Sequence, residues 1–300
     1  MTSRPTAAER VAVVVATRDR AQELATTLEH LLALPEHPEI VVVDNASSDD
    51  TVALVRRRFP QVTLVPLAHN LWAAARTVGA RQAIAPFIAF SDDDSWWAPG
   101  SLRKAASLFL AHPRLGLVAA RVEVGSARVP DPTTEAMGRS PLAQSSRLDR
   151  PGVLGFLACG CIVRREAFLG VGGFQQRFEI GGEEELLALD LASAGWGLHY
   201  AHDVVAHHHP SLQRDGAARR RRQKRNLFWT AWLRYPTRSA LGATLSVLRD
   251  GARDPSTFLA LSDALRDWRW VARERRPLHA EVAGALETLM RSDAYEDGAA

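Results

Sequence analysis

The feature of this sequence that most restricts its fold is an alternation of short apolar runs with helical patterns between residues 11 and 90. Such runs, when rich in β-branched residues, are typical of strands buried on both faces of a sheet. They are Val11–Ala16, Glu39–Asp44, Gln61–Leu67 and Phe87–Phe90. Because helical patterns separate them, the sequence predicts right-handed βαβ units and an α/β fold with a mostly parallel central sheet.

Polar clusters follow three of these runs, at the point where each predicted strand ends. The clusters are Thr17–Arg20, Asp44–Asp50 and Asp92–Asp94. In sheets of this kind, ligands bind beyond the carboxyl ends of the strands. The sequence therefore predicts a binding site at this edge.

The alternation weakens in the second half of the chain. Ser126–Gly152 is rich in Ser, Pro and Arg and predicts a long loop, of the kind that often forms a lid or a binding segment. Gly155–Phe168 predicts a strand and a helix start, and Gly181–Gly195 predicts a helix with an acidic first turn and a glycine cap. From Arg219 onward the chain reads as helical, with two or three amphipathic helices after residue 235.

The overall composition describes a globular protein with an ample core, at 46% hydrophobic and 24% charged residues. The N-terminus has no apolar signal region, and no run of about 18 apolar residues occurs. The two cysteines lie one residue apart, which does not suit a disulfide framework and fits a reducing compartment. We therefore expect a cytoplasmic protein that does not span a membrane.

Three adjacent carboxylates, Asp92 to Asp94, follow the fourth apolar run and should repel one another. An Asp-x-Asp turn at the ligand edge of a sheet can hold Mg²⁺ or Mn²⁺, with substrate phosphates as further ligands. The alternative is a helix N-cap, in which Asp94 or Ser95 caps a helix near Pro99 and its neighbours are solvated. The residues alone leave both interpretations open.

Four further positions have a functional and a structural interpretation. Asp44 could accept a hydrogen bond from a base or ribose, or form an Asx-type turn. Arg76, among small residues, could bind a diphosphate or lie on the surface. Glu183–Glu185 could contain a general base, or only complement the helix dipole. One of His207–His209 could complete a metal site, or all three could be structural.

The segment from Arg219 to Tyr235 is basic and then aromatic. It has six cationic residues up to Arg225, followed by Phe228, Trp229, Trp232 and Tyr235. It could dock on an anionic membrane surface or bind nucleic acid. Alternatively, it is a helix that packs its aromatic face on the catalytic domain and leaves its arginines in solvent.

Taken in order, these segments resemble an inverting glycosyltransferase of family 2 with the GT-A fold. The matching motifs are ATRDR, VVVDNASSDDT, NLWAAARTVGARQA, FSDDDSWWAPGSL, VRREAFLGVGGF, GGEEELLALDLASAGWGL and VVAHHHPS. The resemblance covers about residues 11–212. It implies a Rossmann-like GT-A catalytic domain at 1–218, with a nucleotide-sugar half at about 1–122 and an acceptor half at about 123–218. A helical C-terminal extension would occupy 219–300.

On the donor side, the resemblance implies a nucleotide-sugar of the UDP, dTDP or GDP type. The implied donor-binding residues are Thr17, Arg18, Asp44, Arg76, Asp92 and Asp93. Among these, Arg76 would lie near the diphosphate, and Asp93 would face the ribose or the sugar. Asp92 and Asp94 end the Asp-x-Asp motif, in which Asp94 would be the principal ligand of Mn²⁺ or Mg²⁺. His207 would contact the metal or the diphosphate.

On the acceptor side, the resemblance places the general base at Glu184, with Glu183 beside it. The base would deprotonate a hydroxyl of a glycan or lipid-linked acceptor in a single displacement, and the metal and Arg76 would stabilise the departing nucleoside diphosphate. A lipid-linked acceptor would fit peripheral contact of Arg219–Tyr235 with the inner face of the membrane. No nucleic-acid partner is expected.

Three residues depart from the family pattern. Trp72 stands where a glycine is usual, which predicts a reshaped donor pocket. The base is a glutamate rather than an aspartate, and Asp190 replaces a common arginine. A catalytically silent nucleotide-sugar-binding scaffold is the alternative function, and the retained Asp92, Asp94, Arg76 and Glu184 argue against it. A nucleotidyltransferase or a dinucleotide oxidoreductase would need a glycine-rich loop after the first strand, where the chain has ATRDR.

Overall fold

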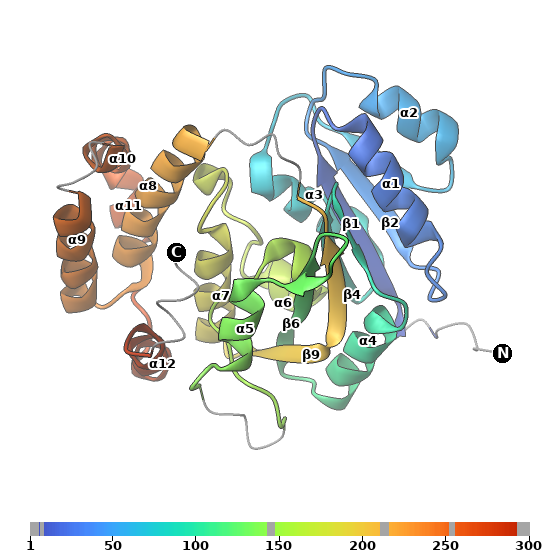
Figure 1. The fold of residues 1–300 in the computed structure, drawn as a ribbon. Coiled ribbons are helices and arrows are strands. Elements are labelled where there is room, and N and C mark those ends of the chain that lie inside the picture. Colours follow the sequence, from blue (N-terminus) through green and yellow to red (C-terminus); the bar gives the residue numbers. More distant parts are fainter. Residues whose placement is uncertain (1–5, 7–8, 143–147, 211–215, 252–255, 293–300) are drawn as a thin grey trace.

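A central sheet is the main element of the fold (Figure 1). The computed structural model describes residues 6, 9–142, 148–210, 216–251 and 256–292. Among these residues, nine strands form one sheet in the order β3-β2-β1-β4-β8-β6-β9-β5, with β7 paired to β6. The strands are β1 Val11–Thr17, β2 Glu39–Asp44, β3 Thr63–Pro66, β4 Phe87–Asp92, β5 Ser95–Trp97, β6 Leu115–Val124, β7 Val129–Pro130, β8 Cys161–Arg164 and β9 Gly197–His208.

The first four strands are parallel, as the sequence predicted. Helices α1 (Ala21–Leu32), α2 (Thr51–Arg58) and α3 (Ala75–Gln82) connect them. Alternate residues of β1 enter different apolar clusters: Val13 packs with the α1 side and Val14 with the α3 side. At Gly79 of α3, an added Cβ would lie 2.4 Å from a methyl carbon of Val14, so a glycine is needed for this close approach.

Beyond β4 the sheet is mixed. Strand β8 is antiparallel to both β4 and β6, whereas β6 and β9 are parallel. Helices α4 (Ser101–Ala111), α6 (Arg165–Gly170) and α7 (Glu183–Ser193) pack around this half. After α7, Gly195 has the left-handed φ of +79°, which confirms the predicted glycine cap.

The segment Ser126–Gly152 is more ordered than the predicted long loop. It contains β7 and helix α5 (Pro132–Gly138). The side chain of Asp131 accepts a hydrogen bond from the Thr133 amide, and Pro132 occupies the first turn. This capping pattern is a helix-start signal that the loop prediction overlooked. Residues 143–147 of the predicted loop lie outside the described part.

The C-terminal part is helical, as predicted, and forms a separate layer at one end of the molecule (Figure 1). It consists of α8 Gly216–Arg234, α9 Thr237–Gly251, α10 Ser256–Arg266, α11 Trp268–Glu274 and α12 Ala280–Met290. Four helices therefore follow α8 in the described residues, where the sequence predicted two or three.

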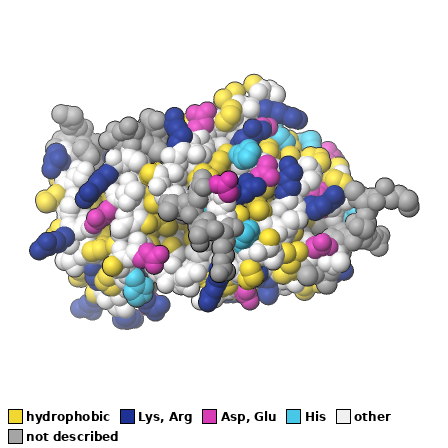
Figure 2. Space-filling model, turned by 90° about the horizontal axis from the view of Figure 1, so that it is seen from below, with side chains coloured by type: hydrophobic (Ala, Val, Ile, Leu, Met, Phe, Trp, Pro, Cys, Tyr) yellow, Lys and Arg dark blue, Asp and Glu magenta, His cyan; other side chains and the backbone are white. Residues whose placement is uncertain are grey.

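Helix α8 turns its aromatic side chains inward. Phe228, Trp229 and Tyr235 are buried in apolar clusters with leucines of α7. The aromatic side chains thus pack as in the alternative in which this segment places its aromatic face on the catalytic domain, and contact of its arginines with a membrane stays a prediction. Figure 2 shows cationic side chains spread over the C-terminal helices on the face in view rather than gathered in one patch. In the described residues, no helix is both long and apolar enough to cross a bilayer.

Candidate active site

The ends of β1, β2 and β4 meet at one edge of the sheet. Thr17 of β1 is in register with Asp44 of β2, and Ala16 is in register with Asp92 of β4. The polar clusters that follow these strands are thus neighbours in space, and the convergence predicted from the strand pattern is present.

The acidic turn Asp92–Asp94 lies between β4 and β5 and not at a helix start. The next helix, α4, begins at Ser101 and is preceded by Gly100, so the N-cap interpretation of Asp94 is wrong. Two arginines offset the repulsion between the carboxylates. Arg76 forms an ion pair with Asp92, and Arg20 lies 3.2 Å from both Asp93 and Asp94.

Asp93 faces the end of β1. Its Oδ2 accepts a hydrogen bond of 2.9 Å from the Thr17 hydroxyl. Burial, reinforced by the charges of Asp92 and Asp94, raises the pKa of Asp93 to about 7, although Arg20 opposes the shift. One of the three crowded acids can therefore carry a proton near neutral pH, which reduces the charge of the turn.

The histidines at the end of β9 point to opposite faces of the strand. His207 Nδ1 lies 3.4 Å from Glu123 Oε2, whereas His208 Nε2 lies 3.4 Å from Asp94 Oδ1. Successive side chains of a strand alternate between its faces. The resemblance implied that His207 contacts the metal or the diphosphate, whereas in the structure His208 is the histidine that lies beside the acidic turn.

Three potential metal ligands meet beside the acidic turn. One ligand atom each from Asp92, Cys159 and His208 lies within 4.8 Å of the others. The Nε2 atom of His208 is buried and has no hydrogen-bond partner among the described residues. Burial, together with the charges of Asp92 and Asp94, raises the pKa of Cys159 well above its usual value. A carboxylate, an imidazole and a thiol are all ligands of divalent metals, so these residues fit such an ion.

The turn before α3 has an unusual backbone at Trp72. Its φ is +54°, in the left-handed region that favours glycine. Asn45 holds the turn: its Oδ1 accepts from the Leu71 amide at 3.0 Å, and its side-chain amide donates to the Trp72 carbonyl at 3.3 Å. The guanidinium of Arg222 from α8 lies 4.8 Å from the centroid of the indole ring. At this position, where the resemblance implied a glycine, Trp72 thus has a strained backbone and makes a cation–π contact.

Two other predicted donor residues differ in exposure. Asp44 is buried and accepts a hydrogen bond of 3.1 Å from the Ser47 amide, three residues further along the chain. The side chain of Arg18 is 48% exposed and pairs with Asp19. Asp44 is therefore held in place at the end of β2 by Ser47, and Arg18 is accessible to a ligand.

The glutamates at the start of α7 have different surroundings. Glu183 is buried, and burial and the charge of Glu184 raise its pKa to about 8. Glu184 is half-buried, and burial also raises its pKa. Glu185 accepts a hydrogen bond of 2.5 Å from the hydroxyl of Tyr235. Glu184 is therefore partly accessible and lacks the tyrosine contact that Glu185 makes. It lies next to Glu183, the most buried of the three glutamates.

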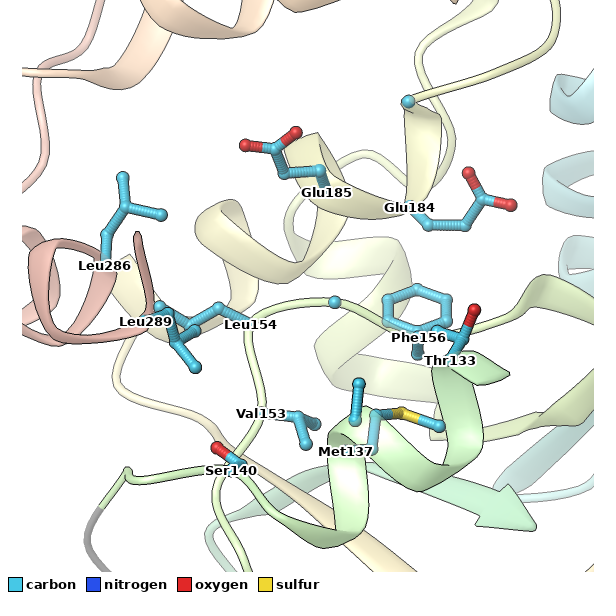
Figure 3. A pocket seen from close by; sticks show the side chains of 13 residues that line it. Thr133, Met137, Ser140, Val153, Leu154, Phe156, Glu184, Glu185, Leu286 and Leu289 are labelled. Carbon is cyan, nitrogen blue, oxygen red and sulfur yellow. The ribbon is translucent and has the colours of Figure 1, made fainter. Parts of the chain in front are cut away.

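A pocket of about 300 Å³ opens beside Glu184 (Figure 3). Figure 3 shows Glu184 and Glu185 on the first turn of α7 with their carboxylates pointing in different directions. The pocket's apolar side chains come from α5, from the segment before η3 (Ala158–Gly160) and from α12, and they include Met137, Val153, Leu154, Phe156, Leu286 and Leu289. Such a site can hold an apolar group next to a carboxylate.

A family model described as Glycosyl transferase family 2 matches residues 12–171, more than half of the chain. The protein belongs to glycosyl transferase family 2. This family 2 protein is 26% identical over 281 residues to the N-acetylglucosaminyl-diphospho-decaprenol L-rhamnosyltransferase of Mycobacterium tuberculosis. That similarity covers 78% of this chain and 90% of the relative.

Solved structures of glycosyltransferases share the fold. S. aureus TarS 1-349 in complex with UDP-GlcNAc aligns with a TM-score of 0.60 at 16% identity, over 97% of this chain and 90% of that chain. In the alignment with a longer S. aureus TarS chain, this protein covers only 43% of that chain. The mannosyltransferase PcManGT from Pyrobaculum calidifontis, in complex with GDP-Man and Mn²⁺, aligns with a TM-score of 0.55 at 19% identity, over 99% and 88% of the two chains. The predicted GT-A fold is confirmed.

Three residues around the acidic turn of this family 2 protein had no role of their own in the sequence prediction. They are Arg20, Cys159 and His208, of which His208 was only one of the three candidates His207–His209. Arg20 belongs to the polar cluster after β1, which was the only local signal for it. Cys159 had no ligand spacing in the sequence, because its neighbours at the site come from β4 and β9.

Proposed function

We propose that this protein is a metal-dependent, inverting glycosyltransferase that moves a sugar from a nucleoside-diphosphate sugar to a hydroxyl of a lipid-linked glycan. One observation carries the proposal: Arg76 forms an ion pair with Asp92 of the acidic turn and lies within the electrostatic field of the first turn of α7. Burial lowers the pKa of Arg76, but the charges of Asp92, Glu183 and Glu184 outweigh burial and raise it. Donor and acceptor chemistry can therefore meet at this side chain.

The donor would bind at the strand ends. We assign its contacts to Thr17, Arg18, Asp44, Arg76, Asp92 and Asp93. A divalent ion, Mn²⁺ or Mg²⁺, would be held by Asp92 and Asp94, with His208 in the place first predicted for His207. When bound, such an ion neutralises charge on the departing diphosphate. Neighbours of the same fold in complex with UDP-GlcNAc and with GDP-Man and Mn²⁺ support this assignment.

Glu184 would act as the general base. It borders the pocket, and its raised pKa moves it towards the operating pH, where a base is most effective. Glu183, with a pKa of about 8, would hold a proton at neutral pH and so reduce the repulsion against a charged Glu184. The attacking oxygen would displace the diphosphate in one step, through an oxocarbenium-like transition state.

The apolar pocket supports a lipid-linked acceptor over a free polysaccharide. It places aliphatic and aromatic side chains next to Glu184, where the acceptor hydroxyl would lie. The mycobacterial relative is named for a diphospho-decaprenol substrate, which is lipid-linked. We therefore place the reaction at the cytoplasmic side of a membrane that supplies the acceptor.

Donor binding and turnover test this function together. Thermal midpoints would be measured with UDP-, dTDP- and GDP-sugars, each with Mn²⁺, with Mg²⁺ and with chelator, because a ligand of the folded state raises the midpoint. We expect a metal-dependent shift with one nucleotide class and transfer to a polyprenyl-diphosphate-linked sugar. A shift without transfer to any acceptor would support the silent scaffold instead. Full transfer in chelator would contradict metal dependence.

A further inference from the structure

Cys159 is a buried thiol beside the acidic turn that the proposed transfer reaction does not use. It is 6% exposed and lies on the 3-10 turn η3. Its sulfur, a carboxylate oxygen of Asp92 and a ring nitrogen of His208 lie within 4.8 Å of one another. Because the three residues come from η3, β4 and β9, the tertiary structure brings them together.

The orientation of His208 points to a ligand independently of the thiol. Its Nε2 atom is buried and lacks a hydrogen-bond partner in the described residues. Buried ring nitrogens are normally hydrogen-bonded or coordinated, so this one is costly without a ligand. The Oδ1 atom of Asp94 lies 3.4 Å from this nitrogen.

The chemistry of the donor set differs from that of an all-oxygen magnesium site. Carboxylates suit Mg²⁺ and Mn²⁺, whereas a thiolate favours softer ions such as Zn²⁺ and Cd²⁺. One sulfur, one imidazole nitrogen and one carboxylate oxygen are all ligands found in zinc sites that keep an open position.

We propose that Cys159 supplies a thiolate to the divalent-metal position formed with Asp92 and His208, so that this position binds Zn²⁺ and Cd²⁺ more tightly than Mn²⁺ or Mg²⁺. On ligation the thiol proton is released to solvent, and the sulfur donates its electron pair to the ion. The inference concerns the metal position of the proposed function, yet it can be tested without turnover. It also predicts that Zn²⁺ competes with Mn²⁺ for the same position.

The second cysteine is a matched control. Cys161 is two residues away and fully buried, and its thiol donates to the Ala158 carbonyl at 3.5 Å. It packs in an apolar cluster and is not part of the ligand group. Both thiols are free. Because the chain has two cysteines, two single substitutions test every thiol.

The experiment is a titration of the metal-free full chain with Cd²⁺, followed by the ultraviolet thiolate-to-cadmium charge-transfer band. We expect a band that saturates at one ion per chain in the wild type and in Cys161→Ser, and no band in Cys159→Ser. Asp92→Asn and His208→Ala should each weaken Cd²⁺ binding by about tenfold or more. Far-ultraviolet circular dichroism and the thermal midpoint verify that each variant is folded.

Three results would overturn the inference: no band in the wild type, a band lost in Cys161→Ser and retained in Cys159→Ser, or a Cd²⁺ affinity unaffected by both Asp92→Asn and His208→Ala. Should Cys159→Ser not fold, the last two variants still decide the question. The readout separates this inference from the proposed function. If the cadmium band is present but no sugar is transferred, only the proposed function is contradicted. If Mn²⁺-dependent transfer occurs without the band, only the proposed ligation by the Cys159 thiolate is contradicted.

Discussion

The side-chain amide of Asn226 donates a hydrogen bond of 2.6 Å to the carbonyl oxygen of Gly181. Asn226 belongs to α8 and is fully buried, and it also donates to the Phe178 carbonyl at 2.7 Å. Gly181 and Gly182 have φ of +93° and +87°, and α7 begins immediately after them at Glu183. The C-terminal helices thus hold the turn from which the candidate base projects.

Replacing Asn226 by leucine should destabilise the protein. The change removes the side-chain donor to the buried Gly181 carbonyl, whereas the Phe178 carbonyl still accepts from the Arg225 guanidinium at 3.2 Å. Because one buried carbonyl that loses its partner costs about 1–3 kcal/mol, we expect the free energy of unfolding to fall by about that amount in urea titrations. Arg220→Ala, an exposed position on the same helix, should stay within about 0.5 kcal/mol of the wild type. An Asn226 variant as stable as that control would show that the two bonds do not support the turn.

The stability should depend on pH through Glu183. Its folded pKa of about 8 lies above its ordinary value of 4.5, because burial and then the charge of Glu184 disfavour its ionised form. The folded chain therefore binds more protons than the unfolded chain between these values, so stability falls as the pH rises through this window. One such group contributes a slope of at most about 1.4 kcal/mol per pH unit.

Unfolding titrations from pH 5 to pH 9 on the wild type and Glu183→Gln would test this. The stability of the variant should decline less with rising pH than that of the wild type. The remaining decline should include the contribution of Asp93, whose pKa is raised to about 7. Glu281→Gln, at an exposed position of α12, should leave the pH profile unchanged. A Glu183→Gln profile identical to that of the wild type would contradict the burial of its charge.

Glu184 and Glu185 are adjacent but should differ in their effect on turnover. Glu184→Gln removes the proposed base and should lower the transfer rate by about 10²–10⁴-fold, while the donor-induced thermal shift is retained. Glu185 is engaged by the hydroxyl of Tyr235, so Glu185→Gln should change the rate only a few-fold. Steady-state rates with a lipid-linked acceptor decide between them. A larger loss in Glu185→Gln would exchange the two roles.

The two histidines of β9 provide a similar pair. His208→Ala should weaken Mn²⁺-supported donor binding by about tenfold or more, because His208 lies beside Asp94. His207→Ala removes a contact with Glu123 on the other face and should leave that affinity within about twofold. Calorimetric titration of the donor in the presence of Mn²⁺ measures both. The opposite order would restore the first sequence prediction.

The backbone at Trp72 can be tested by comparing two small replacements. Both Trp72→Gly and Trp72→Ala lose the contact with Arg222, but only glycine adopts the φ of +54° without strain. A left-handed residue with a Cβ costs about 1–2 kcal/mol. We therefore expect Trp72→Gly to be more stable than Trp72→Ala by about 1 kcal/mol in urea unfolding. An alanine variant that is the more stable would contradict a left-handed conformation at this position.

The sequence by itself was sufficient for the architecture of the first half. Apolar runs such as Val11–Ala16, separated by helical patterns, predict a parallel sheet, because strand burial and helix periodicity are local properties. The polar residues after each run then predict the ligand edge. The cap after α7 could also be predicted from the local sequence, because glycine readily adopts the left-handed conformation that Gly195 has in the structure.

Tertiary structure alone decided which residues face one another at the site. In the pairing of β5 with β9, His208 lies opposite Ser95 and His207 lies opposite Trp96. Because successive side chains of a strand alternate between its faces, this register places His208, and not His207, beside Asp94. Pairings between distant segments leave no local pattern, and the same is true of Cys159, which reaches Asp92 only through the packing of η3 beside β4.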